Sequence, residues 1–446
     1  MKYIRFSQLY KIPSSNGLSR PSAIRGTGFN MVGMGELFSN DILTDMKMDR
    51  VQMSEKEQNK YLLLANDLLF ARQSLVAEGA GKCSIVKYFN EKTTFESHLI
   101  RVRLNENIAN PWYYFYLFKL KSNPIKTIIN QCAQAGIRGK ELEKIKLPIP
   151  EISYQNKIVA ILSKYDELIE VNNKRIKLLE QTAEKLYIEW FVHFRFPGYK
   201  NVETKKDKAI GWNLANKLEF SIPANWHFGT LDELAQFKRG KNITTSEAVE
   251  GVVPVISAGI EPSCFHNKPN VVGNSITVSG SGANAGYVSY HLIDIWAADC
   301  SYYQNEKNIW FVYSTLNFLR KVIDNMQVGA AQPHVYPKTL NKISIIVPDE
   351  KNIELFNSKV ATIFDEIRNI NQQNDNLINQ RDLLLPRLMS GKLSVETKTG
   401  SVPKVKKIIS FDEFCSALPM AARAKTISDK DLRAMYEAYI DDDATE

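Results

Sequence analysis

The most regular pattern in the chain is a run of apolar residues from Gln155 to Trp190, spaced alternately four and three positions apart. Lysine, arginine and glutamate fill much of the rest, as is typical of a long helix that packs lengthwise against another helix. Pro148 and Pro150 before the run and Pro197-Gly198 after it are typical helix boundaries. At about 1.5 Å per residue the predicted helix is roughly 50 Å long, which favours a spacer or docking element over a routine core helix. The spaced positions are Ile158, Leu162, Tyr165, Ile169, Asn172, Ile176, Leu179, Ala183, Leu186 and Trp190.

A second run of the same kind begins at Val360. The first run is apolar except at Asn172, and a polar residue at such a position usually fixes the register of a helix pair at some cost in stability. In the second run, Pro386 removes a helical hydrogen bond and predicts a kink or a restart, whereas Gly391 predicts the end of the helix. The spaced positions are Val360, Ile363, Ile367, Ile370, Asn374, Leu377, Arg381, Leu384 and Leu388.

The segments that lead into the two runs repeat each other. Residues Leu142–Glu151 match Leu340–Asp349 at an offset of 198 residues. The stretch Gly273–Ser279 likewise parallels Asn66–Arg72, and the glycine-rich turns that follow both stretches correspond. A repeat of this length indicates two copies of one unit, each a globular domain followed by a long helix. Because the centres of the copies share layout but little sequence, they suggest one job done on two different targets.

The predicted fold class is α+β, with two mixed α/β domains and two long helices. The lysine-rich stretch between the first helix and the second domain predicts a linker. The tail is basic at first and then acidic and amphipathic, which fits a docking helix and an unstructured terminus equally well. The predicted boundaries are 1–150 for the first domain, 151–197 for its helix, 198–220 for the linker, 221–349 for the second domain, 350–392 for its helix and 393–446 for the tail.

The net charge of +8 is unevenly distributed along the 446 residues. Residues 429–446 contain seven acidic and two basic residues, so the rest of the chain carries +13. A basic body favours a polyanionic partner, nucleic acid first, although a solvated basic surface gives the same count. No apolar run approaches the ~18–20 residues of a membrane helix, and Met1–Arg5 leads into no signal-peptide core. We therefore expect a cytoplasmic protein without membrane contact.

The five cysteines and six histidines are dispersed, without the short spacings of metal-binding motifs. Single cysteines in an odd number suit a reducing compartment, and scattered ligand residues predict no metal site.

Three stretches resemble enzyme motifs, and each departs from the motif that it suggests. The turn before Cys83 resembles a phosphate loop, but it lacks the first glycine and has Cys83 where a serine or threonine is needed. The glycines from Gly280 to Gly286 are one position off a dinucleotide fingerprint and fit a tight turn better. Asn110–Tyr113 resembles the Asn-Pro-Pro-aromatic loop of adenine methyltransferases. However, Trp112 replaces the second proline, and a proline at a helix start explains the stretch better.

The remaining candidates for chemistry are polar and basic residues at turns and strand ends. Arginine and lysine suit guanine O6 and N7, and asparagine and glutamine suit adenine N6 and N7, while either cation also binds phosphate. Loops on a rigid scaffold are the usual place for such side chains, although a solvated surface explains any single one. The candidate DNA-binding residues are Arg72, Gln73, Lys82, Arg138 and Lys140 in the first domain, and Lys238, Arg239, Lys241, Ser279, Ser281, Asn284, Gln332 and His334 in the second.

The order and repetition of these pieces resemble the specificity subunit of a type I restriction–modification system. The resemblance extends from the start of the chain to about residue 392. The pieces that carry it are the lead-in Leu147–Glu151 with Gln155, the domain opening Ile222–Trp226, the turn Gly282–Val288 and the segment Arg387–Leu393.

The resemblance implies two target recognition domains, 1–150 and 221–349, each reading one half of a bipartite site in double-stranded DNA. The long helices would pack antiparallel as a coiled coil with a pseudo-twofold relation and would set the gap between the half-sites. Two modification subunits, which hold S-adenosylmethionine, would dock on this scaffold and methylate adenine, and restriction and motor subunits would complete the complex. The chain itself would have no catalytic residues and no cofactor. The residues expected to pack one helix against the other are Ile158, Leu162, Ile169, Asn172, Ile176, Leu179, Ile367, Ile370, Asn374 and Leu377.

Two other functions remain open at this level. One is a stand-alone adenine methyltransferase that uses Asn110–Tyr113, and the other is a helical adaptor for which DNA binding is incidental. The chain also departs from the resemblance in three ways. The first domain has no counterpart of the Pro-x-x-Trp opening at Pro223, Gln155 has no counterpart near Ile353, and the tail after Ser394 matches nothing.

Overall fold

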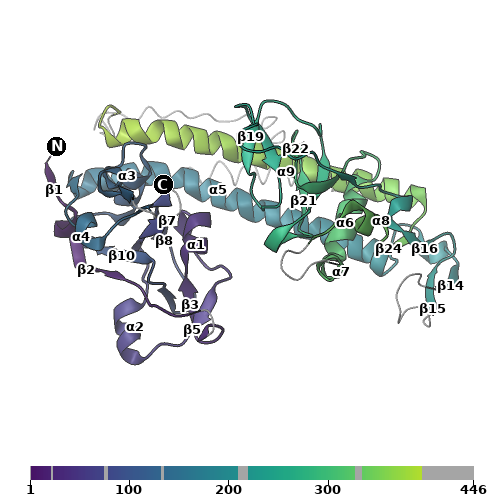
Figure 1. Cartoon of the computed structure of the whole chain (residues 1–446), viewed down its shortest axis with the longest axis horizontal. Coiled ribbons are helices and arrows are strands. Elements are labelled where there is room, and N and C mark those ends of the chain that lie inside the picture. Colours follow the sequence, from purple (N-terminus) through teal and green to yellow (C-terminus); the bar gives the residue numbers. More distant parts are fainter. Residues whose placement is uncertain are drawn as a thin grey trace, which may run out of the picture. The chain divides into compact units, whose positions relative to one another are not determined.

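The computed structural model describes residues 2–21, 24–74, 79–131, 135–208, 219–326 and 334–393 of the protein (Figure 1). From Ser394 onward the predicted tail lies outside the described residues, as does Gln332 among the candidate DNA-binding residues. Two long helices lie side by side in the described part, and each is preceded in the chain by strands and short helices (Figure 1). The described part is therefore mixed α and β, as the sequence predicts.

The first long helix, α5, spans Ile152–Tyr187 and continues as a π-helical turn over Ile188–Val192. The second, α9, spans Glu350–Met389. Each begins directly after the repeated lead-in, with Glu151 as the N-cap of α5 and Asp349 as the N-cap of α9. The two caps are 198 residues apart, which is the offset of the sequence repeat.

Of the kink or restart predicted at Pro386, the restart is wrong, because α9 runs through this residue to Met389. Pro386 lies only one turn before the helix ends, so few helical hydrogen bonds remain beyond it to be disturbed. Gly391 follows the helix in the left-handed conformation, with φ of 71°, and its N–H donates to the carbonyl of Leu388. A glycine at this place ends a helix in the expected way.

Helices α5 and α9 contact each other in antiparallel order. Near the start of α5, Tyr154 Oη donates to the carbonyl of Leu388, 3.2 Å away near the end of α9. Further along, Asn172 Nδ2 donates to Asn374 Oδ1 at 2.8 Å, and Asn374 Nδ2 donates to Asn173 Oδ1 at 3.0 Å. Residue numbers rise along α5 where they fall along α9, so the two helices run in opposite directions.

None of the ten residues predicted to pack helix against helix is exposed. Ile367 also joins the hydrophobic core of the second half, together with Val360 and Phe364 from the same helix. The first part of α9 therefore packs into a globular domain as well as against α5. The buried members of the ten are Ile158, Leu162, Ile367, Ile370 and Asn374, and the half-buried members are Ile169, Asn172, Ile176, Leu179 and Leu377.

The first half is built on a five-stranded sheet of order β2-β10-β6-β8-β4. Its central strand β6 (Leu68–Ala71) is fully buried and pairs antiparallel with both β10 (Leu99–Leu104) and β8 (Cys83–Val86). Helix α3, rich in aromatic residues, contributes six buried aromatic and aliphatic side chains to this core. The other elements are β2 (Tyr10–Asn16), β3 (Phe29–Val32), α1 (Met34–Ser39), β4 (Ile42–Leu43), β5 (Asp49–Val51), α2 (Glu55–Tyr61), β7 (Gln73–Ser74), β9 (Thr93–Phe95), α3 (Pro111–Lys119), β11 (Asn130–Gln131) and β12 (Ala135–Gly136).

The second half contains a four-stranded sheet of order β17-β23-β20-β21. Its central strand β20 (Ser275–Ser279) is also fully buried and pairs antiparallel with β23 (Cys300–Tyr303) and β21 (Val288–His291). The order β23-β20-β21 thus corresponds to β10-β6-β8 of the first half. The other elements are β17 (Lys238–Arg239), β18 (Val253–Ile256), β19 (Cys264–His266), β22 (Trp296–Ala297), α6 (Ile309–Phe318) and α7 (Arg320–Asp324).

The strands that open and close each half also correspond. In the first half, β1 (Tyr3–Arg5) pairs antiparallel with β13 (Lys146–Pro148), directly before α5. In the second half, β16 (His227–Thr230) pairs antiparallel with β24 (Ser344–Val347), directly before α9. A short helix precedes each closing strand, α4 (Gly139–Leu142) in the first half and α8 (Pro337–Asn341) in the second.

Part of the predicted linker 198–220 is a strand. Residues Thr204–Lys208 form β14, which pairs antiparallel with β15 (Glu219–Pro223) at the opening of the second half. Residues 209–218 between these strands lie outside the described part. The lysines that suggested a linker are therefore compatible with a strand pair, because a two-stranded ribbon leaves its side chains accessible to water.

Each half is tied to its long helix by a buried side-chain amide. Gln155 on α5 accepts a hydrogen bond from the N–H of Asn110 at 2.8 Å and donates to the carbonyl of Ile108 at 3.1 Å. These groups lie just before α3. The amide satisfies backbone groups that the start of a short helix would otherwise leave without partners.

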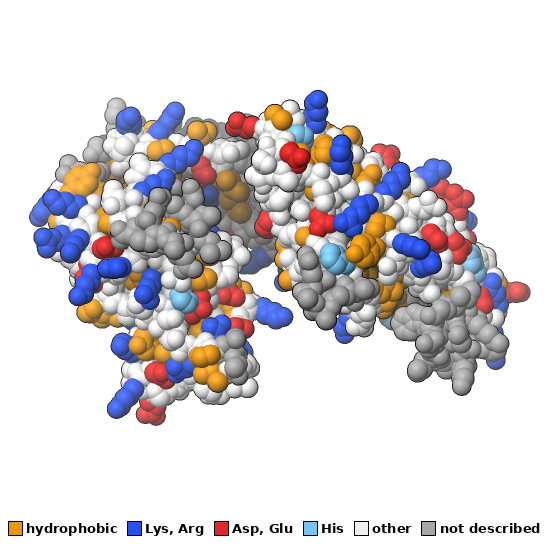
Figure 2. All heavy atoms as spheres, in the orientation of Figure 1, with side chains coloured by type: hydrophobic (Ala, Val, Ile, Leu, Met, Phe, Trp, Pro, Cys, Tyr) orange, Lys and Arg blue, Asp and Glu red, His pale blue; other side chains and the backbone are white. Residues whose placement is uncertain are grey.

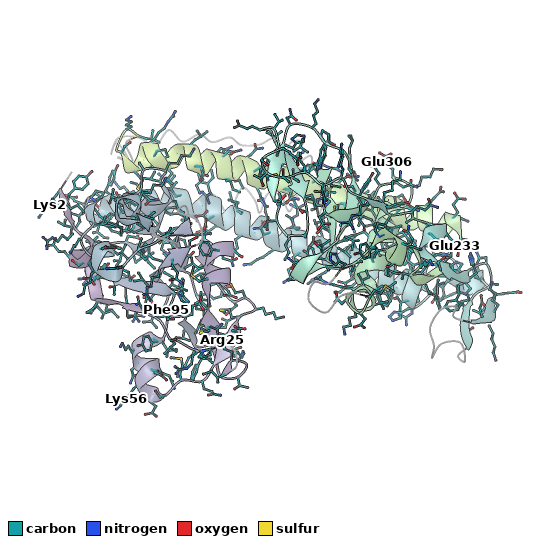
Figure 3. The ribbon with its side chains drawn as sticks, viewed as in Figure 1. Lys2, Arg25, Lys56, Phe95, Glu233 and Glu306 are labelled. Atoms are coloured by element: carbon teal, nitrogen blue, oxygen red, sulfur yellow. The ribbon has the colours of Figure 1, made fainter. Side chains whose placement is uncertain are left out.

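Asn357 on α9 makes the corresponding contacts in the second half. It accepts from the N–H of Trp310, in the first turn of α6, at 2.8 Å. It donates to the carbonyl of Glu306 (labelled in Figure 3), just before α6, at 2.7 Å. Gln155 thus has a structural counterpart. It lies one helical turn beyond the position that the 198-residue offset indicates, and for this reason the sequence comparison at Ile353 missed it.

Candidate nucleic-acid interface

The candidate residues of the first half gather where β6 ends. The N–H of Arg72 donates to the carbonyl of His98, and the carbonyl of Arg72 accepts from the N–H of Ile137. These backbone contacts bring Arg72 and Gln73 beside the segment that leads to Arg138. Arg72, Arg138 and Lys140 are exposed, and Gln73 is half-buried in β7. Four of the five candidates of this half therefore lie on neighbouring segments.

The side chain of Lys82 is half-buried and is paired within the first half. Its Nζ donates to the carbonyl of Phe38 at 2.5 Å and lies 3.4 Å from Asp41, which also pairs with Lys119 at 2.5 Å. Burial raises the pKa of Asp41, but the two lysines outweigh that effect and hold the pKa below its usual value. The prediction that Lys82 is a DNA ligand is not supported by this geometry, because its ammonium group is already paired.

In the second half the candidates gather around the ends of β17 and β20. Lys238 and Arg239 form β17, the edge strand of the sheet, and Lys241 follows it; all three side chains are exposed. Arg239 Nη2 donates to Asp299 Oδ1 at 2.7 Å, and the other oxygen of Asp299 accepts from Ser281 Oγ at 2.5 Å. Arg239 and Ser281 thus share a carboxylate that the sequence did not single out.

The other candidates of the second half differ in accessibility. Ser279 is buried, and its hydroxyl donates to the carbonyl of Ala258, so it is not available to a ligand. Asn284 is half-buried in a short 3-10 turn. His334 forms an isolated β-bridge with Ser281, and its ring stacks on Tyr336 with centroids 5.7 Å apart. Ser279 lies at the end of β20, as the sequence predicts, but its hydroxyl is bonded inside the fold, which residue type and position alone do not reveal.

The two clusters occupy equivalent places in the two halves. The N–H of Gly280 donates to the carbonyl of Asp299, and the carbonyl of Gly280 accepts from the N–H of Val335. Arg72, His98 and Ile137 make the same two bonds in the first half. Gly280 therefore corresponds to Arg72, and Asp299 corresponds to His98.

The edge strands correspond as well. In the first half, Ile100 of β10 is paired with Phe70 on one side and with Asn16 on the other. In the second half, Ser301 of β23 is paired with Val278 on one side and with Arg239 on the other. Arg239 therefore occupies the position of Asn16. Asn16 is followed by Gly17, and Arg239 is followed by Gly240. The N–H of Gly17 donates to the carbonyl of Leu99, and the N–H of Gly240 donates to the carbonyl of Cys300.

Gly17 and Gly240 are needed where the chain passes close to another segment. A Cβ atom on Gly17 would lie 2.1 Å from the carbonyl oxygen of Phe95 (labelled in Figure 3), and one on Gly240 would lie 2.3 Å from the carbonyl oxygen of Ala298. Both obstacles are backbone atoms, which cannot move aside as a flexible side chain can. The frame around Asn16 and Arg239 is thus built in the same way in both halves.

Four exposed or half-buried residues of this frame were missed by reasoning from sequence: Asn16, His98, Asp299 and Tyr336. No local motif marks them. The 198-residue offset of the repeat does not lead from Arg239 to Asn16, and only strand pairing reveals that the two positions are equivalent.

Charge alone does not single out the interface. Figure 2 shows lysine and arginine side chains over the visible face of both halves, with acidic side chains between them. Many of the cations are paired within the described part, for example Arg103 with Asp67 at 2.6 Å and Arg50 with Glu91 at 2.7 Å. The cations that remain available are more informative than the net charge.

The stretch that resembles a methyltransferase loop caps a helix. Asn110 is the N-cap of α3, its Oδ1 accepts from the N–H of Trp112 at 2.9 Å, and its Nδ2 donates to Asn156 Oδ1 at 2.7 Å. Pro111 occupies the first helical position. Since its carboxamide is engaged on both sides, Asn110 performs a structural role that accounts for its sequence context.

Within the described ranges, no three His, Cys, Asp or Glu side chains lie close enough together to hold a metal ion. No helix in those ranges is both long and apolar enough to cross a membrane.

Comparison with known proteins identifies the family. A model of the type I restriction modification DNA specificity domain matches residues 15–181 and 223–380, which is more than half of the chain. The chain is 27% identical to the MjaIX specificity subunit of Methanocaldococcus jannaschii over 310 residues, which cover 64% of this chain and 69% of the relative. It is 23% identical to the HindI specificity subunit of Haemophilus influenzae over 415 residues, covering 75% and 88%. The solved specificity subunit from M. genitalium is 17% identical, with a TM-score of 0.47 and coverage of 87% and 95%.

The chain belongs to the family of type I restriction–modification DNA specificity proteins, and the resemblance inferred from its sequence is confirmed. It is the DNA-specificity component of such a system. The two matched segments contain the corresponding strands β10-β6-β8 and β23-β20-β21, each with most of the long helix that follows.

Proposed function

We propose that each half of the chain recognises one part of a bipartite DNA site. The observation that carries this proposal is the shared frame of the two halves. They have corresponding sheets, corresponding backbone contacts at Arg72 and Gly280, and corresponding edge glycines, yet the exposed side chains on that frame differ. One frame with two sets of polar side chains fits one task performed on two base sequences.

The long helices act as the spacer between these target recognition domains and form an antiparallel coiled coil with a pseudo-twofold relation. The pair Asn172 and Asn374 supports a fixed register, since a polar residue in an apolar seam penalises slipped pairings. The helices also dock two modification subunits. Four exposed apolar side chains on α5 support this role, because they lie at helical spacing outside the contact with α9: Ile161, Leu168, Val171 and Leu178.

Methyl transfer takes place on the modification subunits, which bind S-adenosylmethionine, and restriction and motor subunits complete the assembly. In this division of labour the chain contributes sequence recognition and no catalytic residue, and it acts on cytoplasmic DNA. The capping role of Asn110 supports this assignment over that of a stand-alone methyltransferase.

The test is to sequence the methylated bases of cells that express the chain with its modification subunit, with each partner omitted in turn. The expected result is one split motif that requires both proteins. Purified complex should bind a duplex containing that motif, with an affinity that falls steeply as salt rises.

The alternatives predict different results. Methyl transfer from labelled cofactor by the isolated chain would establish a methyltransferase. Binding to modification subunits together with indifference to DNA sequence at every salt concentration would establish a helical adaptor.

A further inference from the structure

The edge strand β17 presents one arginine, Arg239, whose side chain is held by two contacts. Arg239 Nη2 is bonded to Asp299 Oδ1 at 2.7 Å, and its guanidinium carbon lies 5.9 Å from the centroid of the Tyr336 ring. The side chain of Arg239 is nevertheless 42% exposed. A cation held by two contacts and still open to solvent differs from Lys238 and Lys241, whose ammonium groups make no side-chain contact within the described residues.

The carboxylate of Asp299 orients the Arg239 side chain. One carboxylate oxygen accepts from Arg239 and the other accepts from Ser281, so both oxygens are engaged within the protein. Its side chain is only 23% exposed. Asp299 is therefore a positioning residue, and the group that faces outward is the guanidinium.

The guanidinium keeps enough donors for a ligand. Arginine has five N–H donors in a planar fork, and the bond to Asp299 uses one of them. A planar pair of donors matches O6 and N7 of guanine, and pre-orientation lowers the entropy lost on binding. An ion pair at the surface contributes little to stability, so stability is a weak reason for this arrangement.

In the first half, the strand position of Arg239 is occupied by a different polar residue, Asn16. Asn16 has the strand position of Arg239, is exposed, and is followed like Arg239 by a glycine with no room for a side chain. Asparagine is the side chain that pairs in a bidentate manner with N6 and N7 of adenine. The equivalent positions thus hold two different side chains, each of which matches a purine edge.

We propose that this strand position reads a base in each half, with Arg239, held by Asp299, contacting a guanine and Asn16 contacting an adenine. The inference rests on the proposed function and goes beyond it by naming the reading residues. It separates Arg239 from Lys238, whose side chain points to the opposite face of the strand because successive strand residues alternate.

The experiment uses the full chain expressed with its modification subunit, and the methylated motif is read by sequencing. Arg239→Ala and Arg239→Lys should relax one G·C position in one half-site by roughly 10- to 100-fold and leave the other half-site unchanged. Arg239→Lys keeps the charge but loses the planar pair of donors. If it relaxes the position as much as Arg239→Ala does, Arg239 reads a base and does not merely contribute charge. Asp299→Asn should relax the same position less. Asn16→Ala should relax one A·T position in the opposite half-site.

Lys238→Ala is the matched control, since it removes one exposed positive charge from the same two-residue strand. Because Lys238 is itself a candidate phosphate contact, any loss of methylation should fall on all positions alike and leave the base preference at each position of the motif unchanged. Thermal unfolding of each variant separates loss of folding from loss of reading.

Three outcomes overturn the inference. The motif can be unchanged in the Arg239 variants, methylation can fall uniformly at all positions as expected for a phosphate contact, or the half-site affected by Arg239 can contain no G·C pair. The proposed function fails in a different way, which is that the unchanged chain with its modification subunit directs no split-site methylation at all.

Discussion

Asn172 on α5 and Asn374 on α9 join the two long helices by a hydrogen bond of 2.8 Å, between residues 202 positions apart in the chain. Asn374 is buried, with 7% of its surface exposed, and it donates in turn to Asn173. An amide buried between two helices is satisfied in only one alignment of those helices. The pair therefore specifies register at some cost in stability.

Replacing one member of this pair should cost more than replacing both. Asn172→Leu removes the donor to Asn374 Oδ1, and we expect it to lower the free energy of unfolding by about 1–2 kcal/mol. The double variant Asn172→Leu with Asn374→Leu leaves no buried amide without a partner, since Asn173, which also loses its bond, is exposed to water. The double variant should therefore be at least as stable as the unchanged chain. Urea denaturation of both variants measures this difference.

The same double variant should broaden the accepted gap between half-sites. Methylation of duplexes with different spacer lengths, in the presence of the modification subunit, tests this expectation. If the double variant keeps the original spacing preference unchanged, Asn172 and Asn374 do not control register.

Asp166 on α5 joins three elements, and its removal should be costly. Its side chain is 9% exposed and accepts from Tyr116 Oη on α3 and from Arg381 Nη1 on α9, both at 2.5 Å. Asp166→Asn leaves the half-buried Arg381 paired only with the exposed Asp382, so we expect a loss of about 2 kcal/mol in the free energy of unfolding.

The neighbouring Glu167 is a matched control for Asp166. It is half-exposed and pairs only with Lys164 within one turn, among the contacts of the described residues. Glu167→Gln should change stability by less than about 0.5 kcal/mol. Equal effects of the two substitutions would show that burial of Asp166 has no energetic consequence.

His291 should make the protein sensitive to mild acid. Burial lowers the pKa of His291 from 6.5 to about 4, and a hydrogen bond of 2.8 Å joins its Nε2 to Thr277 Oγ1. Between pH 6.5 and 4 the unfolded chain binds this proton and the folded chain does not, so stability falls as the pH is lowered through that window. The loss amounts to about 2–3 kcal/mol near pH 4 and is absent above pH 6.5.

Chemical denaturation of His291→Gln across that pH range measures this contribution. The variant should lose stability less steeply than the unchanged chain below pH 6.5. His98→Gln, a change at an exposed histidine, serves as the control and should follow the unchanged chain. Identical pH profiles for the unchanged chain and His291→Gln would contradict the expectation.

The edge glycines should tolerate no side chain. Gly17→Ala and Gly240→Ala each place a Cβ within 2.4 Å of a backbone oxygen, 2.1 Å in the first case and 2.3 Å in the second. We expect a loss of about 2–3 kcal/mol for each, because the backbone has to shift. Gly35→Ala in α1 meets no atom within 4 Å and should stabilise by up to about 1 kcal/mol, as a helical glycine replaced by alanine does.

Local and repetitive features of this chain are readable from its sequence, and contacts between distant segments are not. The helices α5 and α9 and the repeated lead-in follow from apolar spacing and from a segment matched over ten residues. The positive-φ turns before the central strands, at Asn66 and Gly273, also fall in stretches that the repeat aligns. These features depend on neighbours in the chain.

The cluster around Arg239 depends instead on strand pairing. Asp299 lies 60 residues from Arg239, and neither its type nor its spacing marks it as the partner. Ser279 and Lys82 were chosen for their polarity and their place beside turns, but tertiary packing pairs both of them internally. Sequence reasoning therefore found Arg239 but missed Asp299, which holds it, and Asn16, which occupies the equivalent position in the first half.

Gln155 and Asn357 make corresponding contacts from positions that differ by one helical turn, and this difference limits how the two halves could be recombined. A chimaera that joins the first domain to the second helix at the 198-residue offset would set Ile353 opposite the carbonyl of Ile108, where an amide is required. A crossover placed between the closing strand and the helix would therefore leave backbone groups unsatisfied. The exchangeable module consists of a domain together with the first two turns of its own helix.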